Sequence, residues 1–203
     1  MLKFNFSKEY ILEDDFVKLS PLESKHIGYL SEISNEPFIW TYFLEKGNGI
    51  KNLTKYIHAT IANRKSKKEY PFVVFDKIKK QYAGTTRFYQ FLADLNAIKL
   101  GHTWYGKEFR ATGLNKHCKY LLFEFAFEKI KVDRIGFGAY LDNTISIAAM
   151  KSVGCKEEGV LRAIFPAING EGRADGILMS ILKNEWNDNV KSDLRKKLNK
   201  TIL

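Results

Sequence analysis

A strand-like run followed by a glycine-bearing turn and an amphipathic helix is the feature that most constrains the fold of this chain. The run covers residues 97–105, the turn covers residues 110–115, and the helical pattern continues to about residue 130. The first N–H groups of a helix lack intrahelical partners, and the helix dipole adds partial positive charge there. Because Gly113 lets the backbone approach a ligand closely, the junction predicts a cradle for an anion such as a phosphate.

The overall composition favours one globular domain. With 203 residues, of which 45% are hydrophobic and 28% charged, the chain can bury one core and resembles ordinary folded proteins in makeup. We expect a single domain over residues 1–203. No signal peptide is evident, and no window approaches the roughly 20 apolar residues of a membrane span, which predicts a cytoplasmic protein without a membrane partner.

Cysteine and histidine spacing argues against a disulfide framework and against a metal site. Cys118 and Cys155 lie far apart and form no Cys-x-x-Cys unit, which predicts reduced, structural thiols. The histidines show no metal-ligand spacing; they are His26, His58, His102 and His117. We therefore expect no metal.

The formal net charge of +10 is concentrated in basic clusters at residues 64–68, 77–80 and 195–197. Such clusters can attract nucleic acid, a polyanionic cofactor or a ribosomal surface. They contain no interleaved aromatic residues of the kind that stack on bases, so we interpret them as a solvated face and do not expect a nucleic-acid partner.

Hydrophobic periodicity and turn residues divide the chain into twelve elements. Strands are expected at residues 11–19, 70–76, 82–92, 97–105, 134–140, 157–167 and 175–182, and helices at 22–33, 50–64, 114–130, 143–154 and from 185 onward. The order β-α-α-β-β-β-α-β-α-β-β-α predicts an α+β (α/β) fold with a mixed, mostly antiparallel twisted sheet of about seven strands and flanking helices. The crossover helix should place residues 134–140 parallel to 97–105.

This order and the turn together resemble the GNAT superfamily of acetyl-CoA-dependent N-acetyltransferases, over residues 11–186. The most specific element of that family is an Arg/Gln-x-x-Gly-x-Gly/Ala loop that binds the pyrophosphate of coenzyme A. The corresponding residues here are Arg110, Ala111, Thr112, Gly113, Leu114 and Asn115. Asn115 replaces the usual small residue, and it either caps the helix or changes how closely the cofactor sits.

Further motifs resemble the ribosomal-protein N-terminal (RimJ/RimL-like) branch of the superfamily. That branch begins its fourth helix with Asn-x-x-Ser, matched by Asn143 and Ser146, and ends it with a glycine and an aromatic residue. Here the end is Gly154 followed by Cys155, without the aromatic. A Glu-Gly-x-Leu-Arg segment at 158–162, an aspartate (Asp175) on a strand and a Glu-Trp pair at 185–186 follow in the expected order.

The resemblance implies that the protein binds acetyl-CoA or CoA at defined residues. The 110–115 loop would hold the pyrophosphate, and the backbone at Trp104 and Tyr105 would hold the pantetheine arm on a strand that splays from its neighbour. Asn143 would bond the cofactor, and Ser146 would donate a hydrogen bond to the departing thiolate as the acid. A core role for the Trp104 ring and simple helix capping by Asn143 and Ser146 are the alternatives.

The sequence leaves open the roles of two lysines and one tyrosine near the expected cofactor site. Lys116 and Lys119, one turn apart, face either the nucleotide phosphates or solvent. Tyr140 is a substitute candidate for the tyrosine acid that many members of the superfamily use.

The general base is unassigned. Related enzymes draw a carboxylate from the strand after Glu-Gly-x-Leu-Arg, but residues 163–167 contain no acid. Asp175, Glu108 and Glu158 are the remaining candidates.

The resemblance implies direct acetyl transfer to a primary amine, either a protein or peptide N-terminal α-amine or a small molecule. An α-amine with a pKa near 7.8 is about one-tenth neutral at pH 7, so it demands less of a base than a lysine does. We expect residues 38–43 and 169–173 to form the acceptor side. The alternative function is that of a non-catalytic module on the same fold that binds CoA, RNA or the ribosome. The sequence leaves open whether the chain forms a homodimer.

Overall fold

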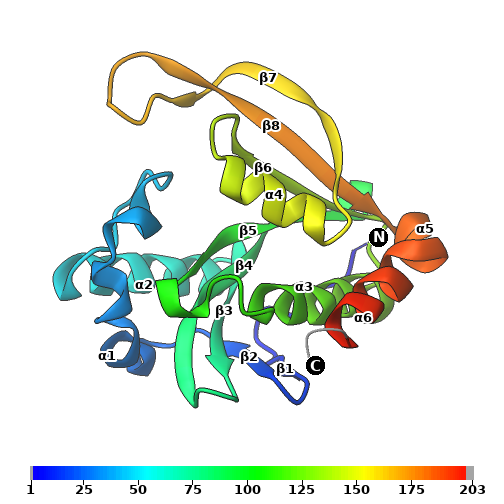
Figure 1. Cartoon of the computed structure of the whole chain (residues 1–203), viewed down its shortest axis with the longest axis horizontal. Coiled ribbons are helices and arrows are strands. Elements are labelled where there is room, and N and C mark those ends of the chain that lie inside the picture. Colours follow the sequence, from blue (N-terminus) through cyan, green and yellow to red (C-terminus); the bar gives the residue numbers. More distant parts are fainter. Residues whose placement is uncertain (1, 200–203) are drawn as a thin grey trace.

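A single eight-stranded sheet forms the centre of the computed structural model, which describes residues 2–199 (Figure 1). Its spatial order is β1-β2-β3-β4-β5-β6-β8-β7, and all neighbours are antiparallel except the parallel pair β5 and β6. The strands are β1 (Leu12–Glu13), β2 (Val17–Pro21), β3 (Glu69–Asp76), β4 (Gln81–Leu92), β5 (Ala97–Tyr105), β6 (Arg134–Tyr140), β7 (Lys156–Pro166) and β8 (Arg173–Leu182). The predicted class, order and parallel crossover are confirmed, with eight strands instead of about seven.

Helices cover both faces of this sheet (Figure 1). They are α1 (Ile27–Leu30), α2 (Ile50–Lys65), α3 (Leu114–Glu124), α4 (Thr144–Ser152), α5 (Lys183–Glu185) and α6 (Lys191–Asn199). The α2 face buries a cluster that includes Leu53, Ile57 and Trp104. The larger cluster lies under α3, α4 and the C-terminal helices, where Trp186 is fully buried. No described helix has the length and apolar character needed to cross a membrane.

The prediction of one continuous strand over residues 11–19 is wrong, because two separate strands lie there. Asp14 interrupts it because the Oδ1 atom accepts the backbone N–H groups of Phe16 and Val17, each at 2.9 Å. This local turn competes with the strand ladder and separates β1 from β2. The other carboxylate oxygen of Asp14 lies 2.7 Å from Nδ1 of His117, which ties the turn to α3.

The predicted helix at residues 22–33 is also wrong as one unit. It is broken into a 3₁₀ turn at Ser24–His26, the short α1, and a second 3₁₀ turn at Ile33–Asn35. Hydroxyl groups contribute to the break, since Ser31 and Ser34 each donate to the carbonyl three residues earlier at 2.8 Å. Apolar spacing alone could not reveal this competition.

The parallel pair β5 and β6 stays together for only three residue pairs, from Ala97 with Arg134 to Lys99 with Gly136. Beyond Lys99, β5 keeps its pairing with β4 while β6 pairs along its whole length with β8. The two strands therefore part, and residues 100–105 of β5 have no strand on the β6 side. We call this opening the splay.

A β-bulge bends β5 inside the splay. Thr85 pairs with Trp104 and Arg87 with Gly101, so two residues of β5 face the single residue Thr86. The first of the two is His102, which has a left-handed φ of 48°. A bulge of this kind increases local strand twist, which accounts for the departure of β5 from β6.

Glycine at position 84 lets β4 approach the bulged strand closely. Gly84 has a φ of 154°, and a Cβ atom there would collide with the backbone carbonyl of Trp104. We predict that Gly84→Ala lowers the free energy of unfolding by about 1–3 kcal/mol, because a methyl group would overpack this contact. Urea denaturation followed by circular dichroism measures the change.

Gly138→Ala in β6 is the matched control, since its Cβ would meet Leu178 at an ordinary 3.7 Å. It should change stability by less than about 0.5 kcal/mol. Equal stability of the two variants would contradict the proposed close approach of β4 and β5.

Candidate functional site

The loop before α3 presents a ring of backbone donors. Ala111 has a φ of 58° and Gly113 a φ of 92°, so left-handed residues alternate along the turn. This alternation turns successive N–H groups towards one side and forms an anion-binding concavity. The N–H groups of Ala111, Thr112, Gly113 and Asn115 have no acceptor among the described residues.

The remaining groups of the loop are used to hold its shape. The Thr112 hydroxyl donates to the Phe109 carbonyl at 2.9 Å, and the N–H of Leu114 reaches the Thr112 hydroxyl at 3.4 Å. Leu114 is buried in the core under α3. The carbonyl of Gly113 accepts from Lys116 and His117 and begins the helix. Hydrogen bonds within the loop thus hold the cradle in shape, and four backbone N–H donors remain free.

The Arg110 side chain does not point freely into this cradle. Its guanidinium lies 3.5 Å from the ring centroid of Phe38, and Nε donates to the Tyr105 carbonyl at 3.3 Å. Burial lowers the pKa of Arg110, and the nearby Glu36 opposes that shift. Arg110 therefore joins the cradle to the segment between α1 and α2, while its backbone N–H bonds Lys107.

The residues at the end of β5 anchor the cradle to the sheet. Trp104 is only 2% exposed and its ring packs 5.4 Å from Trp40, so the side chain belongs to the core. The Tyr105 hydroxyl donates to Oδ1 of Asn115 at 3.4 Å. Asn115 consequently bonds the strand instead of capping the helix, for which the cap residue is Gly113.

The start of α4 lies at the end of the other arm of the splay. Asn143 is its N-cap, and Oδ1 accepts the backbone N–H of Ser146 at 3.1 Å. The capping alternative is thus observed for Asn143, whose Nδ2 group stays free to donate. The Ser146 hydroxyl is half-buried and has no hydrogen-bond partner among the described residues.

His102 is a site residue that sequence reasoning missed. It is the bulge residue, its ring lies 5.0 Å from Tyr89 and 6.2 Å from Phe43, and the side chain is open to solvent within this recess. Its crowded surroundings and the Arg87 guanidinium lower the pKa of His102 to about 3, so the imidazole is neutral at physiological pH. A glycine directly before it inside a strand, which often marks a bulge, was the available signal.

Aromatic residues from three separate segments lie together at one side of the splay. Tyr42 packs 5.5 Å from Tyr140, and Tyr140 stacks on Phe165 at 4.6 Å. Phe43 faces His102 from the same segment between α1 and α2. The predicted 38–43 segment therefore contacts both arms of the splay, whereas the contact from the β7–β8 hairpin comes from Phe165 instead of residues 169–173.

The three candidate bases and the candidate acid Tyr140 all have partners elsewhere in the structure. Asp175 accepts the N–H of Ala163 at 2.8 Å, Glu108 pairs with Lys79 at 3.1 Å, and Glu158 bonds Arg134 and Ser180. The Tyr140 hydroxyl donates to the Pro166 carbonyl at 2.9 Å, and burial raises its pKa. These contacts give each of the four groups a structural partner.

Lys119 differs from both alternatives expected for it, since it faces neither solvent nor the loop. It is 6% exposed, and Nζ donates to the Thr103 hydroxyl of β5 at 3.0 Å. Cys118 and Cys155 are both buried, free thiols, and burial raises the pKa of each to about 12. The described cysteines are therefore protonated and structural at neutral pH, as the sequence predicts.

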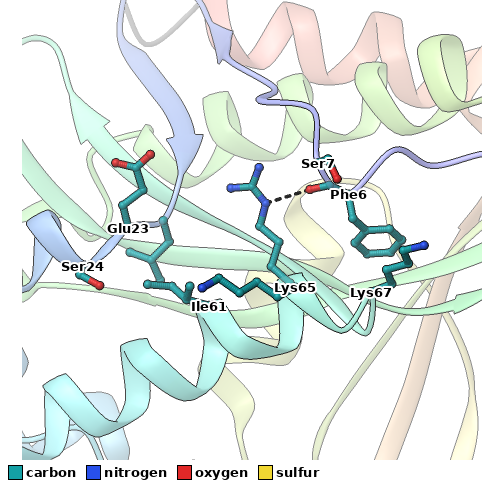
Figure 2. A pocket seen from close by; sticks show the side chains of 9 residues that line it. Phe6, Ser7, Glu23, Ser24, Ile61, Lys65 and Lys67 are labelled. Atoms are coloured by element: carbon teal, nitrogen blue, oxygen red, sulfur yellow. Dashed lines mark hydrogen bonds between the residues drawn. The ribbon is translucent and has the colours of Figure 1, made fainter.

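A separate basic pocket lies beside the C-terminal end of α2 (Figure 2). It has a volume of about 370 Å³ and includes Arg64, Lys65 and Lys67, but no residue of the cradle or splay. The Arg64 guanidinium donates to the carbonyl oxygens of Phe6 and Lys8 and covers the Tyr70 ring. Its charge thus fixes the N-terminal segment. Among residues 2–199, no cluster of three or more His, Cys, Asp or Glu side chains could hold a metal ion.

A family model described as the acetyltransferase (GNAT) domain matches residues 17–156. The chain belongs to this family. No curated protein matches this GNAT chain significantly by sequence.

Solved structures show the same fold. One is a GCN5-related N-acetyltransferase from Brucella melitensis, with 21% identity, a TM-score of 0.85, and coverage of 94% of this chain and 86% of that one. A protein from Vibrio cholerae, proposed to be a ribosomal-protein-serine acetyltransferase, has 22% identity and a TM-score of 0.72 over 85% and 97% of the two chains. The microcin C7 self-immunity acetyltransferase MccE, solved with acetyl-CoA and AMP, has 20% identity and a TM-score of 0.73 over 83% and 93%.

The GNAT family uses acetyl-CoA as the acetyl donor. Four unpaired N–H groups at Ala111, Thr112, Gly113 and Asn115 suit the oxygens of its pyrophosphate. The free β5 edge at residues 100–105 offers backbone groups to the amide-bearing pantetheine arm. The donor set in this GNAT protein therefore fits the cofactor.

We predict that Gly113→Glu raises the dissociation constant for acetyl-CoA by at least about 100-fold, close to 2.7 kcal/mol. The added carboxylate would occupy the cradle and repel the pyrophosphate. Isothermal titration calorimetry measures the affinity.

Gly170→Glu is the matched control, because Gly170 has a similar φ of 86° but a Cβ there would face open space. It should retain wild-type affinity. Unchanged binding by Gly113→Glu would overturn the cradle assignment.

Proposed function

We propose that this GNAT enzyme transfers acetyl from acetyl-CoA directly to a neutral primary amine held in the splay. The observation that carries the proposal is the parting of β5 from β6 beside a cradle of unpaired N–H groups. The cradle would hold the pyrophosphate, and the free β5 backbone would hold the pantetheine arm and polarise the acetyl carbonyl. Acetyl-CoA supplies an activated acyl group when bound.

On the other arm, Asn143 would donate from Nδ2 to the cofactor. Ser146 would donate from its hydroxyl to the departing sulfur. Both groups extend from the first turn of α4, so the capping bond between them fixes their relative position.

His102 is the proposed acceptor of the amine proton. Its neutral imidazole has too low a pKa to deprotonate an ammonium ion from solution, so the enzyme would select amine that is already neutral. The amine nitrogen becomes acidic only as it attacks the carbonyl, and His102 can then accept its proton and release it to solvent. The open edge of the ring provides that route.

An N-terminal α-amine of a peptide or protein is the proposed acceptor class. An α-amine is about one-tenth neutral at pH 7, whereas a lysine amine is neutral in well under a thousandth of molecules. The aromatic wall of Tyr42, Phe43, Tyr140 and Phe165 offers apolar contact area, and the net charge of +10 disfavours a polycationic amine. The names of the similar structures indicate different acceptors, so the choice rests on this chemistry.

A thiol-release assay over a panel of peptides, polyamines and aminoglycosides tests the assignment. The highest kcat/KM should belong to peptides with a free N-terminus, and N-terminally blocked peptides with a free lysine should be turned over poorly. A preference for polyamines would reverse the acceptor assignment. Tight acetyl-CoA binding without turnover of any amine would favour the non-catalytic module.

The pH dependence tests His102 separately. Because its crowded surroundings and Arg87 lower the pKa of His102, the imidazole stays neutral from pH 6 upward. We predict that log kcat/KM rises with unit slope from pH 6 to the pKa of the amine, without a break near 6.5. His102→Gln should lower kcat/KM by about 100-fold while the slope is retained.

His58→Gln, on the exposed face of α2, should leave the rate unchanged. A break near pH 6.5 that disappears in His102→Gln would show that His102 titrates normally. A wild-type rate in His102→Gln would remove it from the mechanism.

A further inference from the structure

Lys119 is a buried ammonium group without a counter-ion. It is 6% exposed, its Nζ has one hydrogen bond, to Thr103, and no carboxylate among residues 2–199 forms a salt bridge with it. The titratable groups that face it are Cys118 of α3 and Cys155 at the entry to β7. Both thiols are protonated at neutral pH because their pKa lies near 12.

Burial of this ammonium group without a counter-ion lowers the stability of the folded protein. An uncompensated buried charge destabilises the folded state by several kcal/mol, and an apolar side chain of similar volume avoids that penalty. The ammonium has three donors and uses one on Thr103. Two donors are thus available for a ligand.

The partner of Lys119 places it beside the free edge of β5. Thr103 directly follows the bulge residue His102 and lies beyond Lys99, the last residue of β5 that pairs with β6. Its hydroxyl also lies 2.7 Å from the Thr86 hydroxyl of β4, so a short polar chain fixes the ammonium at this point. The fixed cation therefore lies next to the splay.

His102 and Thr103 direct their side chains to opposite faces of the sheet. His102 contacts Phe43 and Tyr89 on the α2 face, and Thr103 contacts Lys119 on the α3 face. His102 and Lys119 are therefore presented to the splay from opposite faces of the sheet.

We propose that Lys119 is a catalytic residue that stabilises the departing CoA thiolate and then protonates it. This role rests on the proposed acetyl transfer. As the C–N bond forms and the C–S bond breaks, the electron pair of the C–S bond remains on sulfur, next to the ammonium. Lys119 gives that sulfur a proton and regains one from solvent, while the amine proton leaves through His102.

The acidity of Lys119 suits this exchange. Burial lowers its pKa to about 8, which lies close to the reference value of about 8.5 for a thiol. Proton transfer between groups of similar pKa is nearly balanced. Ser146 can donate a hydrogen bond to the same sulfur but brings no charge.

The pH dependence of CoA affinity tests the proposal without turnover. CoA and desulfo-CoA carry the same phosphates, so the ratio of their affinities isolates the thiol. In the wild-type protein a nearby ammonium that lowers the pKa of the bound thiol by about one unit should raise the affinity of CoA relative to desulfo-CoA by about 2-fold between pH 6.5 and pH 7.5. In Lys119→Met the ratio should stay constant over this range.

Two further variants separate a chemical role from a structural one. Lys129→Met, an exposed lysine farther along the same helical segment, should behave as wild type. Thr103→Val should keep the ammonium but loosen its position, which should reduce the pH-dependent gain. Circular dichroism establishes that each variant is folded, and Lys119→Met should be at least as stable as wild type because a buried charge is removed.

Identical, pH-independent ratios in wild type and Lys119→Met would overturn the role of Lys119. Absence of desulfo-CoA binding by the wild-type protein would instead overturn the cofactor site itself. A pH-dependent ratio that persists in Lys119→Met would assign the effect to another group and also reject the proposal.

Discussion

The parting of β5 and β6 after three residue pairs is the constraint on which the rest of the site depends. A parallel pair normally continues and satisfies its backbone groups, but here β5 stays with β4 and β6 stays with β8. The bulge at His102 increases the local twist of β5, so β5 can remain paired with β4 while β6 remains paired with β8. The next helix after β5 is α3, and the next after β6 is α4. The N-termini of both helices therefore lie near the open end of the splay (Figure 1).

The sheet also divides the chemistry between its two faces. On the α2 face, aromatic rings crowd a neutral imidazole that is open to solvent, which suits a neutral amine and a proton on its way out. On the α3 face, the Lys119 ammonium is held by the Thr103 hydroxyl, which in turn bonds the Thr86 hydroxyl, in a buried environment where low dielectric strengthens its field. The bulge in β5 directs His102 to the α2 face and Thr103 to the α3 face. The backbone of one strand therefore keeps the imidazole and the ammonium on opposite faces of the sheet.

Much of this organisation could be predicted from the sequence, and the failures have local causes. Largely apolar runs bounded by turn residues located β5 and β6, and Gly113 marked the cradle because its turn needs a left-handed residue. The bulge was not predicted, since it shifts side-chain alternation by one residue while leaving composition unchanged. Lys119 was expected to face either the nucleotide phosphates or solvent, whereas the structure buries it beside Cys118 and Leu122 on the inner face of α3.

Two departures from the family pattern act on the same cluster of residues. Asn115, in place of a small residue, accepts the Tyr105 hydroxyl and so joins the end of β5 to the first turn of α3. Cys155, in place of an aromatic residue, faces Lys119 with a protonated thiol. An aromatic ring near an ammonium can bind it through a cation–π contact, whereas a neutral thiol offers only a weak acceptor. Cys155 thus gives Lys119 a neutral neighbour, and in the proposed transfer the ammonium keeps two donors for an anionic sulfur.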